Sequence, residues 1–140
     1  MSFDIKLING DFSFLNGDIK KVEGTSKLVQ DISKICLTDA GANPLQRWYG
    51  SYLSRALIGS GLDISIINNM GKIQLTKALE NLQNLQAAQL RSGQSMSLDE
   101  QLAAIAGISV DQDPNDISTI RAQINCLSKS LKPVNTIIEL

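Results

Sequence analysis

The sequence predicts an α+β fold in one domain, residues 1–140, with β-strands at both ends and helices between them. Three observations predict it. The tripeptide Asn-Gly-Asp occurs twice near the N-terminus, apolar residues recur at helical spacing in the middle, and polar and apolar residues alternate from Thr119 to Cys126 in the segment Thr119–Leu127. With 43% hydrophobic residues, the chain is long enough to bury one core.

The N-terminal segment, about residues 3–22, is expected to form a small β-meander. Asn9-Gly10 and Asn16-Gly17 separate short runs of β-branched, aromatic and alternating residues. Asn-Gly is the strongest short signal for a hairpin turn, because both turn residues need positive φ.

A first helix is predicted over residues 25–38, TSKLVQDISKICLT. Thr25 or Ser26 is expected to cap its N-terminus. Gly41 is expected to end it, and Pro44 to hold Asn43 extended, so that the chain turns away. Its apolar stripe consists of Leu28, Ile32, Ile35 and Cys36.

A short helix, SYLSRALI, and then a long one over about Ile64–Arg91 are predicted next. Between them, Gly59–Asp63 (GSGLD) resembles a phosphate-binding glycine loop. It follows a helix rather than a strand, has no lysine, and places Asp63 where the anion would sit. We interpret it as a capped turn between two helices. The apolar face of the long helix is expected to consist of Ile64, Ile67, Gly71, Leu75, Ala78, Leu79, Leu82, Leu85, Gln89 and Leu90.

The last third is expected to return to strands. Ser97 and Glu100 form a capping box that predicts a short helix over Leu98–Ala106. The alternating strand Thr119–Leu127 then pairs with Val134–Leu140 in an antiparallel hairpin that completes a small sheet.

Composition excludes several classes of function. The formal charge of -1 leaves no strongly basic face, which disfavours nucleic-acid binding. The absence of histidine excludes Cys/His zinc sites and histidine-based catalysis. No apolar run near the N-terminus is long enough for a signal or membrane helix. Cys36 and Cys126 both fall on apolar faces and are expected to be reduced core residues rather than a disulfide.

Two groups of carboxylates invite a test for chemistry. Asp111–Asp116 opens like a calcium loop, but Asp116 stands where glycine is needed and Ala122 where the bidentate glutamate belongs. We interpret it as a solvated hairpin loop. Asp99 and Glu100 are adjacent, so on a helix they would point apart, unlike a glycosidase pair. We therefore expect no enzyme, no cofactor and no metal site.

The segment Thr38–Leu53 concentrates aromatic residues: Trp48 and Tyr49 follow Arg47 and precede Gly50, and Tyr52 comes two residues after that glycine. Stacking on a base or a sugar is one interpretation, although the chain has little other basic charge. The rings can also form a rigid contact surface for another protein, or pin the first helix to the long one. The sequence leaves both of these interpretations open.

The order of motifs resembles the sheath-initiator family of contractile tails. It runs from the two Asn-Gly turns through Gln30–Thr38 (QDISKICLT) to Gly41–Leu53 (GANPLQRWYGSYL). These are the small baseplate wedge proteins of contractile-tailed phages, with relatives in phage-like injection machines and in type VI secretion. The resemblance covers nearly the whole chain.

The resemblance implies a virion structural protein of the tail baseplate, assembled in the host cytoplasm, with copies in a ring around the tube. It implies as partners the tail sheath protein, other baseplate wedge proteins, and tail tube or hub proteins, with no nucleic acid and no membrane. Typical members carry a Glu-Pro-Arg signature just before the strand that follows the helices. The matching place here, taken as Ala104–Ile108, reads AIAGI, so that docking contact is not transferred and the helix Leu98–Ala106 is its expected substitute. The family's old lysozyme-like label is not adopted, because no pair of carboxylates suits it.

Sheath arms are expected to add strands to free sheet edges. The expected edges are Thr119–Leu127 and Val134–Leu140. An adaptor or anti-adaptor that binds one cellular regulator is the alternative, and a muramidase-like enzyme a weaker one. The candidate partner-binding residues are Asn43, Pro44, Arg47, Trp48, Tyr49 and Tyr52 in the aromatic segment, and Thr119, Arg121, Gln123, Asn135 and Thr136 on the strands.

Overall fold

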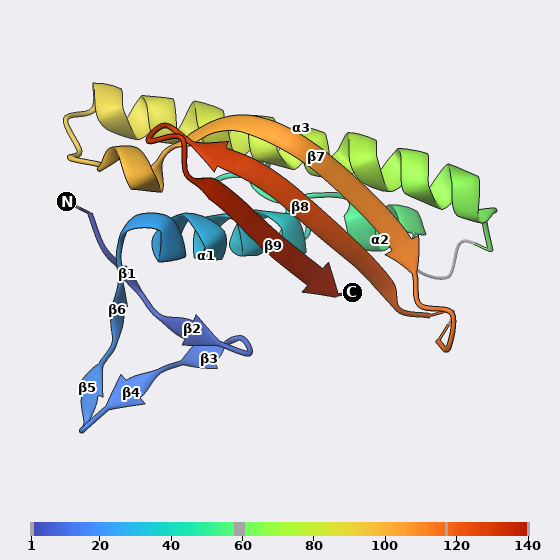
Figure 1. Cartoon of the computed structure of the whole chain (residues 1–140), viewed down its shortest axis with the longest axis horizontal. Helices are drawn as coiled ribbons and strands as arrows, with labels where there is room; N and C mark the ends of the chain where they lie inside the picture. The colour runs from blue at the N-terminus through green and yellow to red at the C-terminus, as the bar shows by residue number, and fades with distance from the viewer. Residues whose placement is uncertain (1, 58–60, 117, 140) are drawn as a thin grey trace.

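The computed structural model describes residues 2–57, 61–116 and 118–139, and it has the predicted α+β class (Figure 1). Along the chain, two groups of strands are separated by three helices: α1 (Gly24–Leu37), α2 (Leu53–Leu57) and α3 (Ile64–Arg91). The first group is β1 (Asp4–Ile5), β2 (Leu7–Ile8), β3 (Asp11–Phe12), β4 (Phe14–Leu15), β5 (Asp18–Ile19) and β6 (Lys21–Val22). The second is β7 (Leu102–Gln112), β8 (Ile120–Ser128) and β9 (Pro133–Glu139).

The N-terminal strands close into a triangle instead of lying side by side. β1 pairs with β6, β2 with β3 and β4 with β5, all antiparallel, and each pair forms one corner (Figure 1). Asn9 and Asn16 have φ of 51° and 52°, which confirms both Asn-Gly turns. We call residues 4–22 the N-terminal triangle.

A seven-residue repeat explains this triangle. Residues 4–24 read DIKLING, DFSFLNG and DIKKVEG, so each repeat starts with aspartate and ends with a glycine of positive φ. Lys6, Ser13 and Lys20 hold the same place in the three repeats. Their backbones form a ring, in which Lys6 N–H donates to Lys20 O, Ser13 N–H to Lys6 O and Lys20 N–H to Ser13 O. Sides of equal length can close in this way.

Helix α1 buries the predicted stripe, but both of its ends differ from expectation. It begins at Gly24, with no side-chain cap from Thr25 or Ser26. The Glu100 carboxylate, from a distant segment, accepts the Gly24 N–H instead, at 3.4 Å. The helix ends at Leu37, where Thr38 turns extended, so Gly41 does not end it.

The segment after α1 is a corner closed on itself, and we call residues 38–53 the aromatic corner. A parallel bridge joins Asp39 to Ser51, and Ser51 N–H donates to Thr38 O at 2.8 Å. Gly50 has φ +117°, and a Cβ there would lie 2.5 Å from Thr38 O. Only glycine fits at that point.

Helix α3 has the predicted bounds and is continuous through Gly71. Asp63 caps it by accepting the Ile64 N–H at 3.0 Å, which supports the interpretation as a capped turn. The preceding Gly59 and Ser60 lie outside the described residues. No helix within the described parts of the chain is long and apolar enough to cross a membrane.

The predicted helix Leu98–Ala106 is wrong. The capping box of Ser97 and Glu100 is present, but it starts only a single 3-10 turn, Leu98–Glu100. Strand β7 then begins at Leu102 and pairs with β8, with register shifts after Leu102 and Ile105. These bulges disturb the alternation that marks a strand in the sequence, and its alanines suit a helix equally well.

The core lies between the sheet, in the order β7-β8-β9, and helices α1 and α3. Cys36 and Cys126 are buried and free, as expected. Burial raises the pKa of the Cys36 thiol to about 12 and that of Cys126 to about 11. Alternate residues of β8 and β9 are buried: Ile120, Ala122, Ile124, Cys126, Ser128, Val134, Thr136 and Ile138.

Candidate protein-binding edge and groove

Strand β9 forms one outer edge of the sheet, whereas β8 lies in its centre. The expectation that Thr119–Leu127 offers a free edge is therefore wrong, because both sides of β8 are already paired. A hairpin predicted from two strands could not reveal this, because the first part of the third strand, up to Ala106, is predicted as a helix and the rest is not predicted as a strand. Gln123 of β8 lies opposite Ser109 of β7 and Ile137 of β9, so it is not at an open edge.

The register shows which backbone groups of β9 remain free. Ser128 N–H donates to Lys132 O at 3.0 Å, which marks these residues as a hydrogen-bonded pair. Such pairs alternate along an antiparallel ladder, so Val134, Thr136 and Ile138 bond to β8. The N–H and C=O groups of Asn135 and Ile137 therefore point outward, as do those of Glu139.

Pro133 lies in this same outward phase, where its missing N–H costs no ladder bond. Outside the β8–β9 ladder, the backbones of Asn135 and Ile137 form no hydrogen bond with any described part of the chain. Asn135 and Ile137 are exposed, and Ile137 keeps 63% of its surface in solvent. The edge is thus open to another strand.

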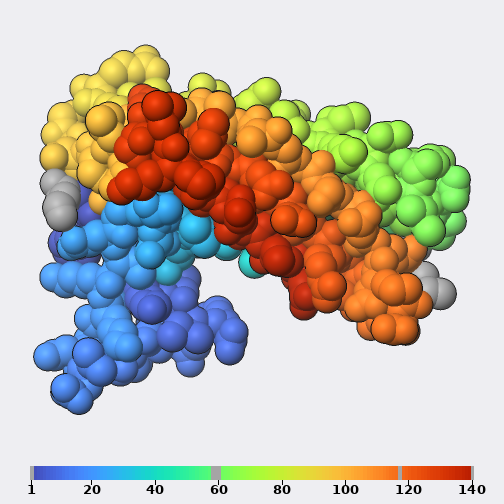
Figure 2. All heavy atoms as spheres, in the orientation of Figure 1, coloured from blue at the N-terminus to red at the C-terminus, as the bar shows by residue number. Residues whose placement is uncertain are grey.

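A groove of about 710 Å³ runs beside this edge, between the N-terminal triangle and α1. Figure 2 shows the corresponding hollow between the triangle and the C-terminal strands. We call it the β9 groove. Its described lining residues are Lys6, Leu7, Asn9, Gly10, Val22, Ser26, Val29, Gln30, Ser33, Lys34, Leu37, Thr38 and Ile137.

Gln30 fixes the triangle against α1 and so shapes the groove. Its Nε2 donates to Asp4 Oδ2 at 2.9 Å and to Ile5 O at 2.8 Å, and its Oε1 accepts the Leu7 N–H at 2.9 Å. Lys34, one turn further along α1, forms an ion pair with Asp4. Sequence reasoning missed this role, and the spacing of four between Gln30 and Lys34 is the only local signal for it.

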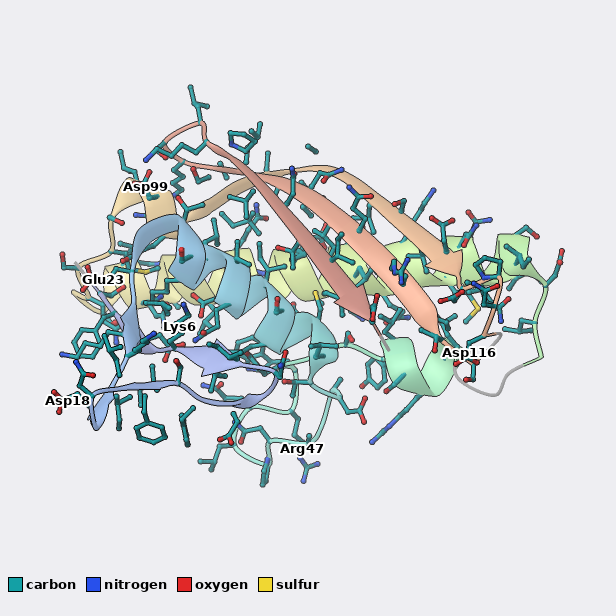
Figure 3. The ribbon with its side chains drawn as sticks, turned by 60° about the horizontal axis from the view of Figure 1, so that its bottom comes forward. Lys6, Asp18, Glu23, Arg47, Asp99 and Asp116 are labelled. Atoms are coloured by element: carbon teal, nitrogen blue, oxygen red, sulfur yellow. The ribbon has the colours of Figure 1, made fainter. Side chains whose placement is uncertain are left out.

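The hydrogen bonds at this contact favour the ionised form of the Asp4 carboxylate. Burial alone would raise the pKa of Asp4, but hydrogen bonds from Lys34, the Ile5 N–H and Gln30 outweigh it and lower that pKa. The Lys34 side chain therefore already has a charged partner, Asp4. Lys6, which Figure 3 shows between α1 and the strands of the triangle, has no ion pair or side-chain hydrogen bond to any described residue.

The three aromatic rings of the aromatic corner differ in their exposure to solvent. Trp48 and Tyr52 remain 45% and 46% exposed and line a second cavity of about 270 Å³ with Arg47 and Lys77. Tyr49 packs on the core and lines a different pocket between α1 and α3. Its burial, helped by the charge of Asp31, raises the pKa of Tyr49 to about 12. The corner therefore pins the two helices and also presents a surface.

The remaining candidate residues are dispersed. Asn43 and Pro44 lie in the exposed loop, where Asn43 Oδ1 accepts the Leu45 N–H at 3.0 Å. Thr119 donates to Asp116 at 2.9 Å in the loop before β8. Arg121 forms an ion pair of 2.8 Å with Glu139 on the solvent face of the sheet. The Thr136 side chain is buried against the helices, so only its backbone belongs to β9's ladder.

The carboxylates offer structural contacts. Hydrogen bonds from Ser130 and Lys132 lower the pKa of Asp99. Burial alone would raise the pKa of Glu100, but hydrogen bonds from Ser2, Ser97 and Gly24 outweigh it and lower that pKa. Asp99 and Asp116 lie at opposite ends of the molecule (Figure 3). Among the described residues, no three His, Cys, Asp or Glu side chains gather closely enough to hold a metal ion.

Because β7 begins at Leu102, the residues just before this strand are not the ones matched by sequence to the family's Glu-Pro-Arg signature. Ala104–Ile108 lies inside the strand. The residues just before the strand are Asp99, Glu100 and Gln101, and Glu100 is fully buried. The predicted docking helix Leu98–Ala106 does not exist.

One solved structure is similar to this chain over most of its length. It is a protein from Geobacter sulfurreducens described as a "putative tail lysozyme". The TM-score is 0.60 over 82% of this chain and 87% of that one. The two proteins share a fold. Their sequences are 11% identical, so the likeness concerns the fold alone. No protein-family model and no curated protein matches the chain.

Proposed function

We propose that this chain is a structural subunit of a contractile phage tail, a baseplate wedge protein that links the baseplate to the first ring of sheath subunits. The free β9 edge carries the proposal. A strand from a sheath subunit would bond to the outward N–H and C=O groups of Asn135 and Ile137. The shared fold with the protein described as a "putative tail lysozyme" supports a tail-related role.

The opposite edge is less suited to strand addition. β7 carries two register shifts, near Leu102 and Ile105, and bulges protect an edge from further pairing. β9 pairs with β8 in unbroken register from Pro133 to Glu139. We therefore assign sheath attachment to β9.

A second contact is assigned to the aromatic corner. Trp48 and Tyr52, with Arg47 and Lys77, offer exposed rings and cations on rigid backbone, which suits a neighbouring wedge, tube or hub protein. Copies of the chain would then surround the tail tube in the virion baseplate after assembly in the host cytoplasm. In this role the protein needs no catalytic activity.

The test is affinity capture of tagged full-length chain from its producer during particle assembly, with mass spectrometry of the captured proteins. Asn135→Pro removes an N–H group that points away from β8, so the hydrogen bonds between β8 and β9 are kept. Recovery of the sheath protein should fall about tenfold or more. Asn135→Ala keeps the N–H and should recover sheath normally.

Circular dichroism and urea unfolding must show that Asn135→Pro remains folded. Undiminished sheath recovery by the folded variant would contradict the β9 assignment. Recovery of a single cellular regulator, and no tail proteins, would favour an adaptor. Cleavage of peptidoglycan by the purified chain would favour an enzyme.

A further inference from the structure

We infer that the β9 groove selects an extended strand that carries a carboxylate side chain facing Lys6, and that the N-terminal triangle clamps this strand against β9. The inference rests on the proposed strand addition and adds to it the chemistry of the incoming segment. It also gives the triangle a function.

The groove has the shape that an added strand requires. Ile137 of the β9 edge forms one side, Val29, Ser33 and Leu37 of α1 line the inner side, and Leu7 of the triangle lies opposite. A strand paired with β9 lies about 4.8 Å from it, which places alternate side chains in the groove. Apolar side chains of that strand would contact Val29 and Leu37.

The charged side chains among the described residues that line the groove are lysines. They are Lys6 and Lys34, and no carboxylate appears among the described lining residues. Lys34 is already paired with Asp4. Lys6 is half-buried and unpaired within the described chain. A carboxylate on the incoming strand would supply its missing partner.

The wall that carries Lys6 is held in place before any partner arrives. Gln30 bonds to Asp4 and Ile5, which precede Lys6 in the chain, and to Leu7, which follows it. The ring of backbone hydrogen bonds through Lys6, Ser13 and Lys20 stiffens the triangle. Binding therefore needs little ordering of this wall, which favours affinity.

A second copy of the chain suits the groove less well. The edge in unbroken register that it would offer is its own β9, whose one carboxylate, Glu139, is already paired with Arg121 at 2.8 Å. Two β9 strands would therefore leave both Lys6 side chains without a partner. A strand from another tail protein, carrying its own acidic residue, satisfies the site.

The experiment tethers a strand to the full chain. A seven-residue strand of Thr and Val, with one Gln, follows residue 140 through a flexible Gly/Ser linker, which gives an effective concentration in the millimolar range. Seven versions place the Gln at each position in turn, and seven matched versions replace it with Glu. Amide hydrogen exchange at Asn135 and Ile137 reports docking.

We expect that Glu at one position or more strengthens docking about threefold relative to Gln. Lys6→Gln should abolish this gain. Lys20→Gln is the matched control, because Lys20 occupies the same place in the repeat but does not line the groove, and it should leave the gain unchanged. The gain should also shrink in 1 M salt, as the ~3 Å screening length there predicts.

The outcomes separate the two proposals. If the tethered strands protect Asn135 and Ile137 equally with Glu and Gln at every position, the carboxylate inference fails while the β9 edge stands. If no strand protects these amides, strand addition itself fails, and with it the proposed sheath contact. Concentration-dependent protection in the untethered chain would show that a second copy occupies the groove, which overturns the inference.

Discussion

Gly71 of α3 lies directly against Val110 of β7: a Cβ added to Gly71 would be 2.9 Å from Val110 Cγ2 and 3.0 Å from Cγ1. Both residues are buried. A glycine within a helix normally costs about 1 kcal/mol relative to alanine, so its presence here reflects the close approach of helix and strand. This contact sets the distance between α3 and the sheet.

Gly71→Ala should therefore destabilise the protein despite its better helix propensity. Val110 is stiff at χ1 and cannot move aside easily, so overpacking of about 1–3 kcal/mol outweighs the helical gain, for a net loss of about 1 kcal/mol. Urea unfolding measures the change. Gly71→Ala combined with Val110→Ala should cost less than the sum of the two single changes. A more stable single variant would show that the contact is loose.

Gly50→Ala should cost about 3 kcal/mol or more, because the new Cβ meets the Thr38 carbonyl at 2.5 Å and the backbone has φ +117°. Gly93→Ala is the matched control, since Gly93 also has positive φ, +89°, but open space around it. It should cost only about 1 kcal/mol. Thermal or urea unfolding of both variants tests the rigidity of the aromatic corner. Equal costs would mean that the corner relaxes freely.

Glu100→Gln should destabilise the chain by about 1–3 kcal/mol at pH 7, because a buried carboxylate that accepts bonds from Ser2, Ser97 and Gly24 is lost. The folded-state pKa of Glu100 lies below its unfolded value of 4.5. The unfolded chain therefore binds more protons in that range, and stability rises with pH.

The contribution of Glu100 is thus complete above pH 4.5 and is lost as pH falls through the folded-state pKa. The difference in unfolding free energy between the two proteins should therefore narrow when the pH is lowered from 7 to below 4.5. Glu80→Gln, a change at an exposed position of α3, should alter stability little at either pH. If the difference in unfolding free energy between the wild-type protein and Glu100→Gln did not change with pH, Glu100 would not be ionised in the folded protein.

Thr136→Val should stabilise the protein by about 0.5–1 kcal/mol. The Thr136 Oγ1 is buried and has no hydrogen-bond partner among the described residues, so replacing the hydroxyl by a methyl group removes a desolvation cost. Partner capture should be unchanged, because this side chain faces the helices. Loss of sheath recovery with intact folding would show that the Thr136 side chain contacts the partner after all.

Several elements could be predicted because their signals are local. The stripe of Leu28, Ile32 and Ile35 follows from a helical period, and the bounds of α3 follow from the same period and the cap at Asp63. The Asn-Gly turns require positive φ whatever surrounds them. Each of these features depends on residues within a few positions of one another.

Strand β7 could not be predicted in this way. Its first part, LAAIA, suits a helix, and pairing with β8 makes it part of a strand. That pairing decides in turn that β8 is central and that the free edge belongs to β9. The edge is therefore a consequence of contacts between segments far apart in the chain.

The sequence by itself determined the α+β class, the helical stripes, the hairpin turns and the alternation of β8. The tertiary structure alone decided which strand is exposed, which carboxylate caps α1, and that Lys6 and Ile137 line the same groove. The physical reason is range. Propensity, capping and periodicity act over one or two turns, whereas edges, grooves and buried ion contacts arise only when distant segments pack together.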